Sequence, residues 1–161
     1  MRTAERALRH FMKEGKSDAM IKEIEIPDVP LWAIWAIQHY ARTMGVEACR
    51  EKYGRLVTDI LDYIIRGNHP NLLVHDNGLL YSSGRNAIIS WMNSTLNGAP
   101  VNPRSGYLVE MNGLWYNALR FAADLMAQGE GSAAHIEKWN TIAEKVKGRS
   151  EDTRLNSSHV T

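Results

Sequence analysis

The stretch from Trp91 to Leu119, WMNSTLNGAPVNPRSGYLVEMNGLWYNAL, gathers side-chain types that bind sugars. It combines tryptophan and tyrosine rings with asparagine amides, one arginine and one glutamate. Aromatic faces hold neutral polyols, and planar amide, guanidinium and carboxylate groups bind neighbouring hydroxyls. The composition therefore predicts a binding site for a neutral carbohydrate. The candidate contact residues are Trp91, Asn93, Asn97, Arg104, Tyr107, Glu110, Asn112, Trp115, Tyr116 and Asn117.

Each of these residues also has a structural interpretation. Trp115 and Leu119 are four positions apart, so they share one helix face and could belong to the core. Asn97 precedes Gly98, a pair typical of a tight turn. The cluster as a whole favours a ligand site more strongly than any single residue does.

Bulk composition excludes several other classes of protein. The chain of 161 residues has a net charge of +1 and no basic run, which argues against nucleic acid and anionic membranes as partners. No apolar run approaches the roughly 20 residues of a membrane span. A single cysteine, Cys49, excludes an internal disulfide framework and fits a reducing, cytoplasmic setting. There is no Gly-rich phosphate loop and no His/Cys set with metal-ligand spacing.

Apolar spacing and capping signals predict five helices. The second helix, between Asp28 as N-cap and Gly45, is apolar nearly all round, which predicts burial on most sides. The third has mixed faces and the fifth is amphipathic, whereas the fourth is again rich in apolar and aromatic residues. The predicted ranges are about 3–13, 29–44, 46–66, 109–128 and 132–146.

The order of these helices is outer, buried, outer, buried, outer, with tight Gly-containing turns after the buried ones. Such alternation predicts an all-α fold of the toroid type, built from helical hairpins, which five helices alone cannot close. The segment 68–108 is far longer than an ordinary connection, so we expect it to be functional and to carry short strands at 79–81 and 87–91.

The last residues, 149–161, read RSEDTRLNSSHVT and show no helical or strand period. The run TRLNSSH also resembles the translation of a common sequencing-adapter read. We therefore divide the chain into a domain fragment, 1–148, and a non-native or disordered tail, 149–161.

Two blocks of the sequence resemble the amylo-alpha-1,6-glucosidase domain of glycogen debranching enzymes. DNGLLYSSGRNAIISWMNSTLNGAPVNPRSGYLVEMNGLWYNAL is similar to that family's DGLL…WMD…PRxGxxVExNALWYNAL pattern. Upstream, IPDVPLWAIWAIQHYARTMG is similar to the family's VDASLWFIWAVQQY segment. The resemblance spans about residues 7–127. It implies an (α/α)6 barrel, of which this chain would form a part.

The resemblance also implies an activity: hydrolysis of the α-1,6-linked glucose left at a trimmed branch point of glycogen or a related α-glucan, without a metal or organic cofactor. In an inverting mechanism one carboxylic acid protonates the glycosidic oxygen and a second carboxylate activates water. The family pattern has an aspartate after Trp-Met as the acid, whereas this sequence has Asn93, and an amide cannot donate a proton as a carboxylic acid does.

Glu110 is the strongest alternative within the motif. It begins the fourth helix, where the helix dipole favours a carboxylate, so it suits a base or hydroxyl acceptor better than an acid. Asp28 could cap its helix, bind a glucose hydroxyl, or do both. The general base would lie beyond the last residue. The candidate catalytic residues are Asn93 and Glu110, and the candidate substrate-binding residues are Asp28, Trp32, Trp91, Arg104, Trp115 and Asn117.

The sequence is also compatible with two other hypotheses. In one, Asn93 marks a carbohydrate-binding relative without hydrolytic activity. In the other, the chain is an unrelated all-α scaffold whose aromatic residues form its core. If the chain is instead part of a debranching glucosidase, we expect this fragment alone to be inactive or nearly so.

Overall fold

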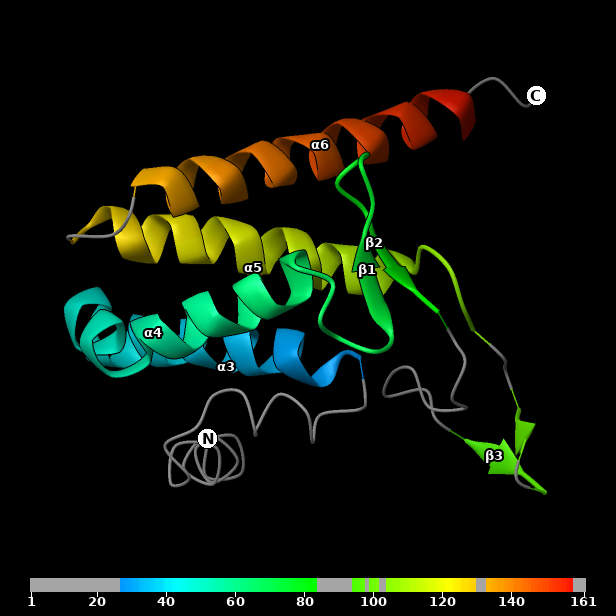
Figure 1. Cartoon of the computed structure of the whole chain (residues 1–161), viewed down its shortest axis with the longest axis horizontal. Helices are drawn as coiled ribbons and strands as arrows, with labels where there is room; N and C mark the ends of the chain where they lie inside the picture. Colours follow the sequence, from blue (N-terminus) through cyan, green and yellow to red (C-terminus); the bar gives the residue numbers. More distant parts are fainter. Residues whose placement is uncertain (1–26, 84–93, 98, 102–103, 130–132, 158–161) are drawn as a thin grey trace.

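The computed structural model describes residues 27–83, 94–97, 99–101, 104–129 and 133–157. The predicted helix at 3–13 and the predicted strand at 87–91 lie outside these residues. The described part is mostly helical, with two small antiparallel sheets (Figure 1). Its elements are α3 (Val29–Met44), α4 (Val46–Ile65), β1 (Leu72–Val74), β2 (Leu80–Ser82), β3 (Thr95–Leu96), β4 (Ala99–Pro100), α5 (Val109–Ala127) and α6 (Ala133–Ser157).

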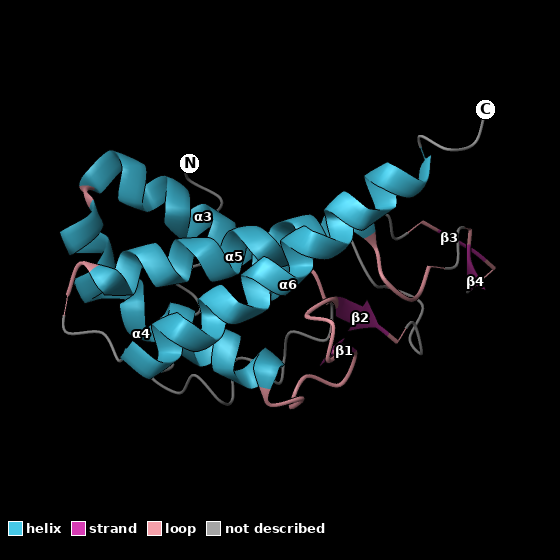
Figure 2. Ribbon diagram, turned by 90° about the horizontal axis from the view of Figure 1, so that it is seen from above, coloured by secondary structure: helices cyan, strands magenta, loops and turns pink. Residues whose placement is uncertain are grey.

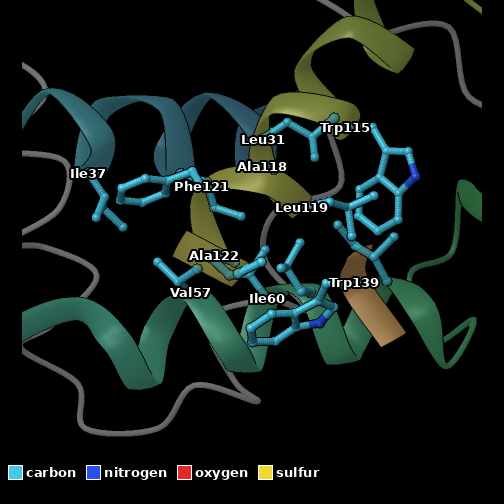
Figure 3. Packing of buried hydrophobic residues seen from close by; sticks show 14 of the residues in the cluster. Leu31, Ile37, Val57, Ile60, Trp115, Ala118, Leu119, Phe121, Ala122 and Trp139 are labelled. Atoms are coloured by element: carbon cyan, nitrogen blue, oxygen red, sulfur yellow. The ribbon is translucent and has the colours of Figure 1, made fainter. Parts of the chain in front are cut away.

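The helices form a bundle with α5 at its centre, in contact with α3, α4 and α6. Figure 1 shows α3 and α5 beginning at the same end of the bundle, whereas α4 and α6 run in the opposite direction. The core between them includes Leu31, Val57 and Leu119 (Figure 3). The prediction of an all-α architecture is confirmed at this level. The four described helices do not by themselves form a closed ring of helical hairpins.

Helix boundaries follow the glycine signals closely. Gly45 adopts φ 94°, a conformation that L side chains rarely adopt, and separates α3 from α4 as predicted. Gly67, with φ 71°, follows Arg66, the C-cap residue of α4. The predicted fourth helix coincides with α5 to within one residue. These turns are readable because a residue with positive φ is nearly always glycine.

The prediction that the second helix is buried on most sides is wrong for α3. Its buried residues, which include Leu31 and Ile34, lie on one side, while Trp32 and Trp35 are 39% and 42% exposed. The reason is that α3 packs mainly against two neighbours, α4 and α5. An apolar residue type marks a side chain that can be buried and does not identify what covers it.

The fifth predicted helix is longer than expected. α6 continues to Ser157, well past the predicted end at 146 and into the segment interpreted as a tail without helical structure. Figure 1 shows the C-terminal end of α6 extending beyond the start of α5. Residues 147–154, KGRSEDTR, include several good helix formers and no proline, so a helix can continue there without an apolar stripe. The origin of segment 149–161 stays a prediction.

The long segment between α4 and α5 contains ordered structure. β1 and β2 pair antiparallel, with Leu73 opposite Tyr81, and the predicted strand at 79–81 overlaps β2. Thr95 pairs with Pro100 in the second hairpin, where Asn97 has φ 53°, so the predicted Asn-Gly turn is confirmed. Both hairpins lie at one end of the bundle (Figure 2). None of the described helices is long and apolar enough to cross a bilayer.

Gly78 allows the tip of the β1–β2 hairpin to approach α6, and Gly78→Ala should lower the free energy of unfolding by about 2–3 kcal/mol. Its φ is 83°, and a Cβ there would lie 2.7 Å from Lys145 Cβ and 3.0 Å from the Ile142 carbonyl oxygen. The matched control is Gly67→Ala, which has a similar φ of 71° but no atom closer than 3.8 Å. Urea unfolding should show only about 1 kcal/mol for the control. Equal losses would rule out crowding against α6.

Candidate functional site

Helices α3 and α5 run parallel, and four of the predicted site residues lie near their N-terminal ends, at one end of the bundle. Asn117 Nδ2 of α5 donates a hydrogen bond to Gln38 Oε1 of α3 at 3.0 Å, which fixes the register between the helices. Because both helices run the same way from this contact, Asp28 and Glu110 lie toward the same end (Figure 1). Asn117 itself is partly buried between the helices, where its amide is engaged with Gln38.

Glu110 and Arg104 form an ion pair at the start of α5. Their side chains are 32% and 23% exposed, so the pair is partly shielded and still reachable from solvent. The approach to the helix is held by Gly106, whose N–H and carbonyl both bond to the backbone of Ser82 in β2, at 2.8 and 2.9 Å. The β1–β2 hairpin therefore positions the segment that carries Arg104. A fixed guanidinium–carboxylate pair offers both donors and acceptors to a polyol.

Asp28 lies at the N-cap position of α3 but makes no side-chain capping bond. Its backbone is helical, φ −82° and ψ −18°, rather than extended, the conformation from which an N-cap side chain usually reaches the first free N–H groups. Asp28 thus holds the predicted N-cap position, but it does not make the predicted side-chain capping bond. Trp32 Nε1 donates to Asp28 Oδ2 at 3.2 Å instead. This bond fixes an indole ring that is 39% exposed beside a carboxylate that is almost buried.

A second exposed ring extends the surface of α3. Trp35 meets Trp32 edge to face, with ring centroids 5.6 Å apart. His39 lies against Trp35 at a centroid distance of 4.0 Å. Because the three residues are spaced by three and four positions, their rings lie along one face of α3. Trp32 is thus the part of this row nearest to the end where Glu110 lies.

Trp115 has no exposed surface, and its Nε1 donates to the carbonyl oxygen of Gly78 at 3.1 Å (Figure 3). In this position the ring has no face on which a sugar could stack, in agreement with the alternative that it belongs to the core. Asn112 is similarly turned inward, toward the hairpin. Trp91 and Asn93 lie outside the described residues.

A cluster that residue types alone did not single out lies on the hairpin. His75 stacks on Tyr81, with ring planes 12° apart, and Nδ1 of His75 is hydrogen-bonded to the hydroxyl of Tyr107. Tyr107 meets both of the other rings at its edge. Tyr107 was a candidate from its place in the loop, but its neighbours are distant in sequence. The alternation of side chains along the β1–β2 hairpin is the only sequence signal that could have indicated that these rings lie together.

Within the described residues no group of His, Cys, Asp or Glu is arranged to hold a metal ion. Cys49 is fully buried, and burial raises the pKa of its thiol. Cys49 thus belongs to the core rather than to a reactive site.

A model of the amylo-alpha-1,6-glucosidase family matches residues 12–158. The match includes every candidate residue named above and also α6 to its end. No curated protein and no solved structure matches the chain.

Proposed function

Because the chain belongs to the amylo-alpha-1,6-glucosidase family, we propose that it is part of a longer protein that releases glucose from α-1,6 branch stubs of glycogen or a related α-glucan. The family match is the observation that carries this proposal. It also removes the alternative of an unrelated all-α scaffold. The proposed fold of the complete domain is an (α/α)6 barrel, in which α3 and α5 are inner helices and α4 and α6 outer ones.

The direction of the helices supports this arrangement. α3 and α5 run parallel, and each is followed by a helix that returns in the opposite direction (Figure 1). In a ring of such hairpins, the N-terminal ends of the inner helices meet at one mouth. That mouth is the end at which Asp28, Trp32, Arg104 and Glu110 lie. We propose a cytoplasmic protein that needs no cofactor for this reaction, with an α-glucan rather than nucleic acid or a membrane as its partner.

The proposed reaction is inverting hydrolysis. A carboxylic acid protonates the glycosidic oxygen as the bond to glucose breaks, and a carboxylate about 6.5–9.5 Å away takes a proton from the attacking water. In this chain the position of the acid holds Asn93, and the base would come from another part of the protein. Glu110 is paired with Arg104, which suits it to accept hydrogen bonds from glucose hydroxyls. Trp32 offers an exposed ring held by Asp28.

Restoring the acid should reveal the chemistry of the site. In the complete protein, Asn93→Asp should raise the rate of glucose release from a branch-stub dextrin by about a hundredfold, the usual contribution of a general acid. Asn93→Ala is the matched control, because it removes the amide without supplying a proton donor and should leave the slow rate unchanged. Initial rates are measured as free glucose.

The same assay distinguishes the second candidate function, which Asn93 favours. A carbohydrate-binding relative without hydrolytic activity should bind the dextrin and release no glucose in any of the three forms. Equal rates for wild type and Asn93→Asp would contradict the assignment of this position to the acid. Binding without release would contradict the hydrolytic proposal as a whole.

A further inference from the structure

A surface depression lies beside the His75, Tyr81 and Tyr107 cluster. Its volume is about 500 Å³, within the range of roughly 300–1,000 Å³ typical of small-ligand sites. It is lined by Leu73, Val74, His75, Asp76, Asn77 and Tyr107. Tyr107 is 46% exposed and Leu73 is 49% exposed, so the lining presents an aromatic ring and an aliphatic side chain to solvent.

The ring of Tyr107 is held in place before any ligand arrives. Its hydroxyl is hydrogen-bonded to His75, and its edge packs against Tyr81 at a centroid distance of 5.5 Å. His75 in turn stacks on Tyr81. A ring fixed from two sides loses little conformational freedom on binding, which favours affinity. His75 therefore acts as a positioning residue for Tyr107.

Polar groups suited to hydroxyls lie at the same depression. Asp76 is exposed in the turn between β1 and β2, and its side chain supplies a carboxylate at the rim. The turn is anchored because Asp76 accepts a hydrogen bond from Lys145 Nζ through its backbone carbonyl, at 3.1 Å. Asn77 accepts a bond from Leu79 N through Oδ1, which leaves its NH₂ group as a possible donor to a ligand. An aromatic platform with a carboxylate and an amide beside it suits a polyhydroxylated ring.

We propose that this depression binds glucosyl units of the α-1,4-linked chain that carries the branch, as a subsite distinct from the Arg104–Glu110 pair. The inference rests on the proposed function for the identity of the sugar. Tyr107 lies between Arg104 and Glu110 in sequence, so one glucan chain could contact both the depression and the Arg104–Glu110 pair. A subsite for the main chain would let the protein recognise the branch through more than the single glucose that is removed.

The test uses maltoheptaose, a linear α-1,4-linked glucan, and the 161-residue chain in an NMR titration. Backbone amide shifts should change at His75, Asp76, Asn77 and Tyr107. Asp76→Ala and Tyr107→Ala should each weaken binding about tenfold, the effect of one lost hydrogen bond or ring contact. Tyr107→Phe keeps the ring but loses the bond to His75, so it should weaken binding, though less than Tyr107→Ala does. Asp124→Ala, an exposed acidic residue of α5 far along the helix, is the matched control for Asp76.

Absence of shifts at the hairpin, or unchanged affinity in both Asp76→Ala and Tyr107→Ala, would overturn the subsite. If Tyr107→Ala loses the dispersed spectrum of a folded chain, Asp76→Ala decides alone. Glucose release from a branch stub by the complete protein, without maltoheptaose binding here, would remove the subsite and leave the proposed function. Maltoheptaose binding at the hairpin without glucose release by the complete protein would support the subsite and contradict the proposed hydrolytic function.

Discussion

Trp115→Ala should lower the free energy of unfolding by about 4–5 kcal/mol, the largest effect we expect from one substitution. The ring of Trp115 is fully buried, so truncation removes its contacts and leaves a cavity between α5 and its neighbours. The Gly78 carbonyl oxygen also loses the indole N–H that it accepts at 3.1 Å. That bond ties the β1–β2 hairpin to α5, so the hairpin should be loosened as well.

Trp35→Ala is the matched control for this substitution. Trp35 is 42% exposed, so its removal should change stability by less than about 1 kcal/mol. Urea unfolding followed by circular dichroism measures both variants. A Trp115→Ala chain that is already unfolded without urea agrees with the expectation. A loss below about 1 kcal/mol would mean that Trp115 is not the buried anchor described here.

Asn112→Asp should destabilise the chain by about 4 kcal/mol at neutral pH. Asn112 Oδ1 accepts from the Leu80 N–H at 2.8 Å, while Nδ2 donates to the carbonyl oxygens of Leu80 and Leu108, each at 3.0 Å. The side-chain amide of Asn112, in α5, thereby makes with Leu80 of β2 the two hydrogen bonds that the backbone of a neighbouring strand would make. An aspartate keeps the accepted bond but faces two carbonyl oxygens with a buried negative charge and no donor.

The effect of Asn112→Asp should depend on pH. Burial raises the pKa of the introduced carboxyl above its unfolded value, so the penalty is complete above that raised pKa and declines as pH falls through it. Asn117→Asp is the matched control, because Asn117 is only partly buried and the amide of Gln38 can turn to donate to the new carboxylate. It should cost less than about 1 kcal/mol. Unfolding curves for both variants across acidic and neutral pH test this, and a pH-independent loss in Asn112→Asp would contradict it.

Helices α3, α4 and α5 were predictable because their ends are marked by local signals. Gly45 and Gly67 occupy conformations that other residues rarely adopt. The apolar residues between these glycines recur at helical spacing, which predicts a helix. The end of α6 was not predictable in this way. Beyond Val146 the sequence has no apolar stripe that identifies the rest of the helix. Helix propensity alone remains, and it is a weak signal.

The candidate site was predictable in composition but not in geometry. The motif identified Arg104 and Glu110, yet only the structure pairs them in space. Trp115 and Trp32 are the same residue type at the same kind of helix, and one is buried while the other is exposed. The direction of each ring depends on which helix covers it, and that is a tertiary property. For the same reason the pairing of His75 with Tyr107 could not be read from the chain.

The most direct test of the proposed glucosidase activity is proton NMR of the complete protein acting on a branch-stub dextrin, observed from the first minutes. A linear maltodextrin of the same length is the matched substrate control. We expect slow glucose release from the branched substrate, first as the β anomer because an inverting mechanism reverses the α linkage, and none from the linear one. Release from the linear substrate at the same rate, or no release from either, would contradict the assignment of this chain to an α-1,6-glucosidase site.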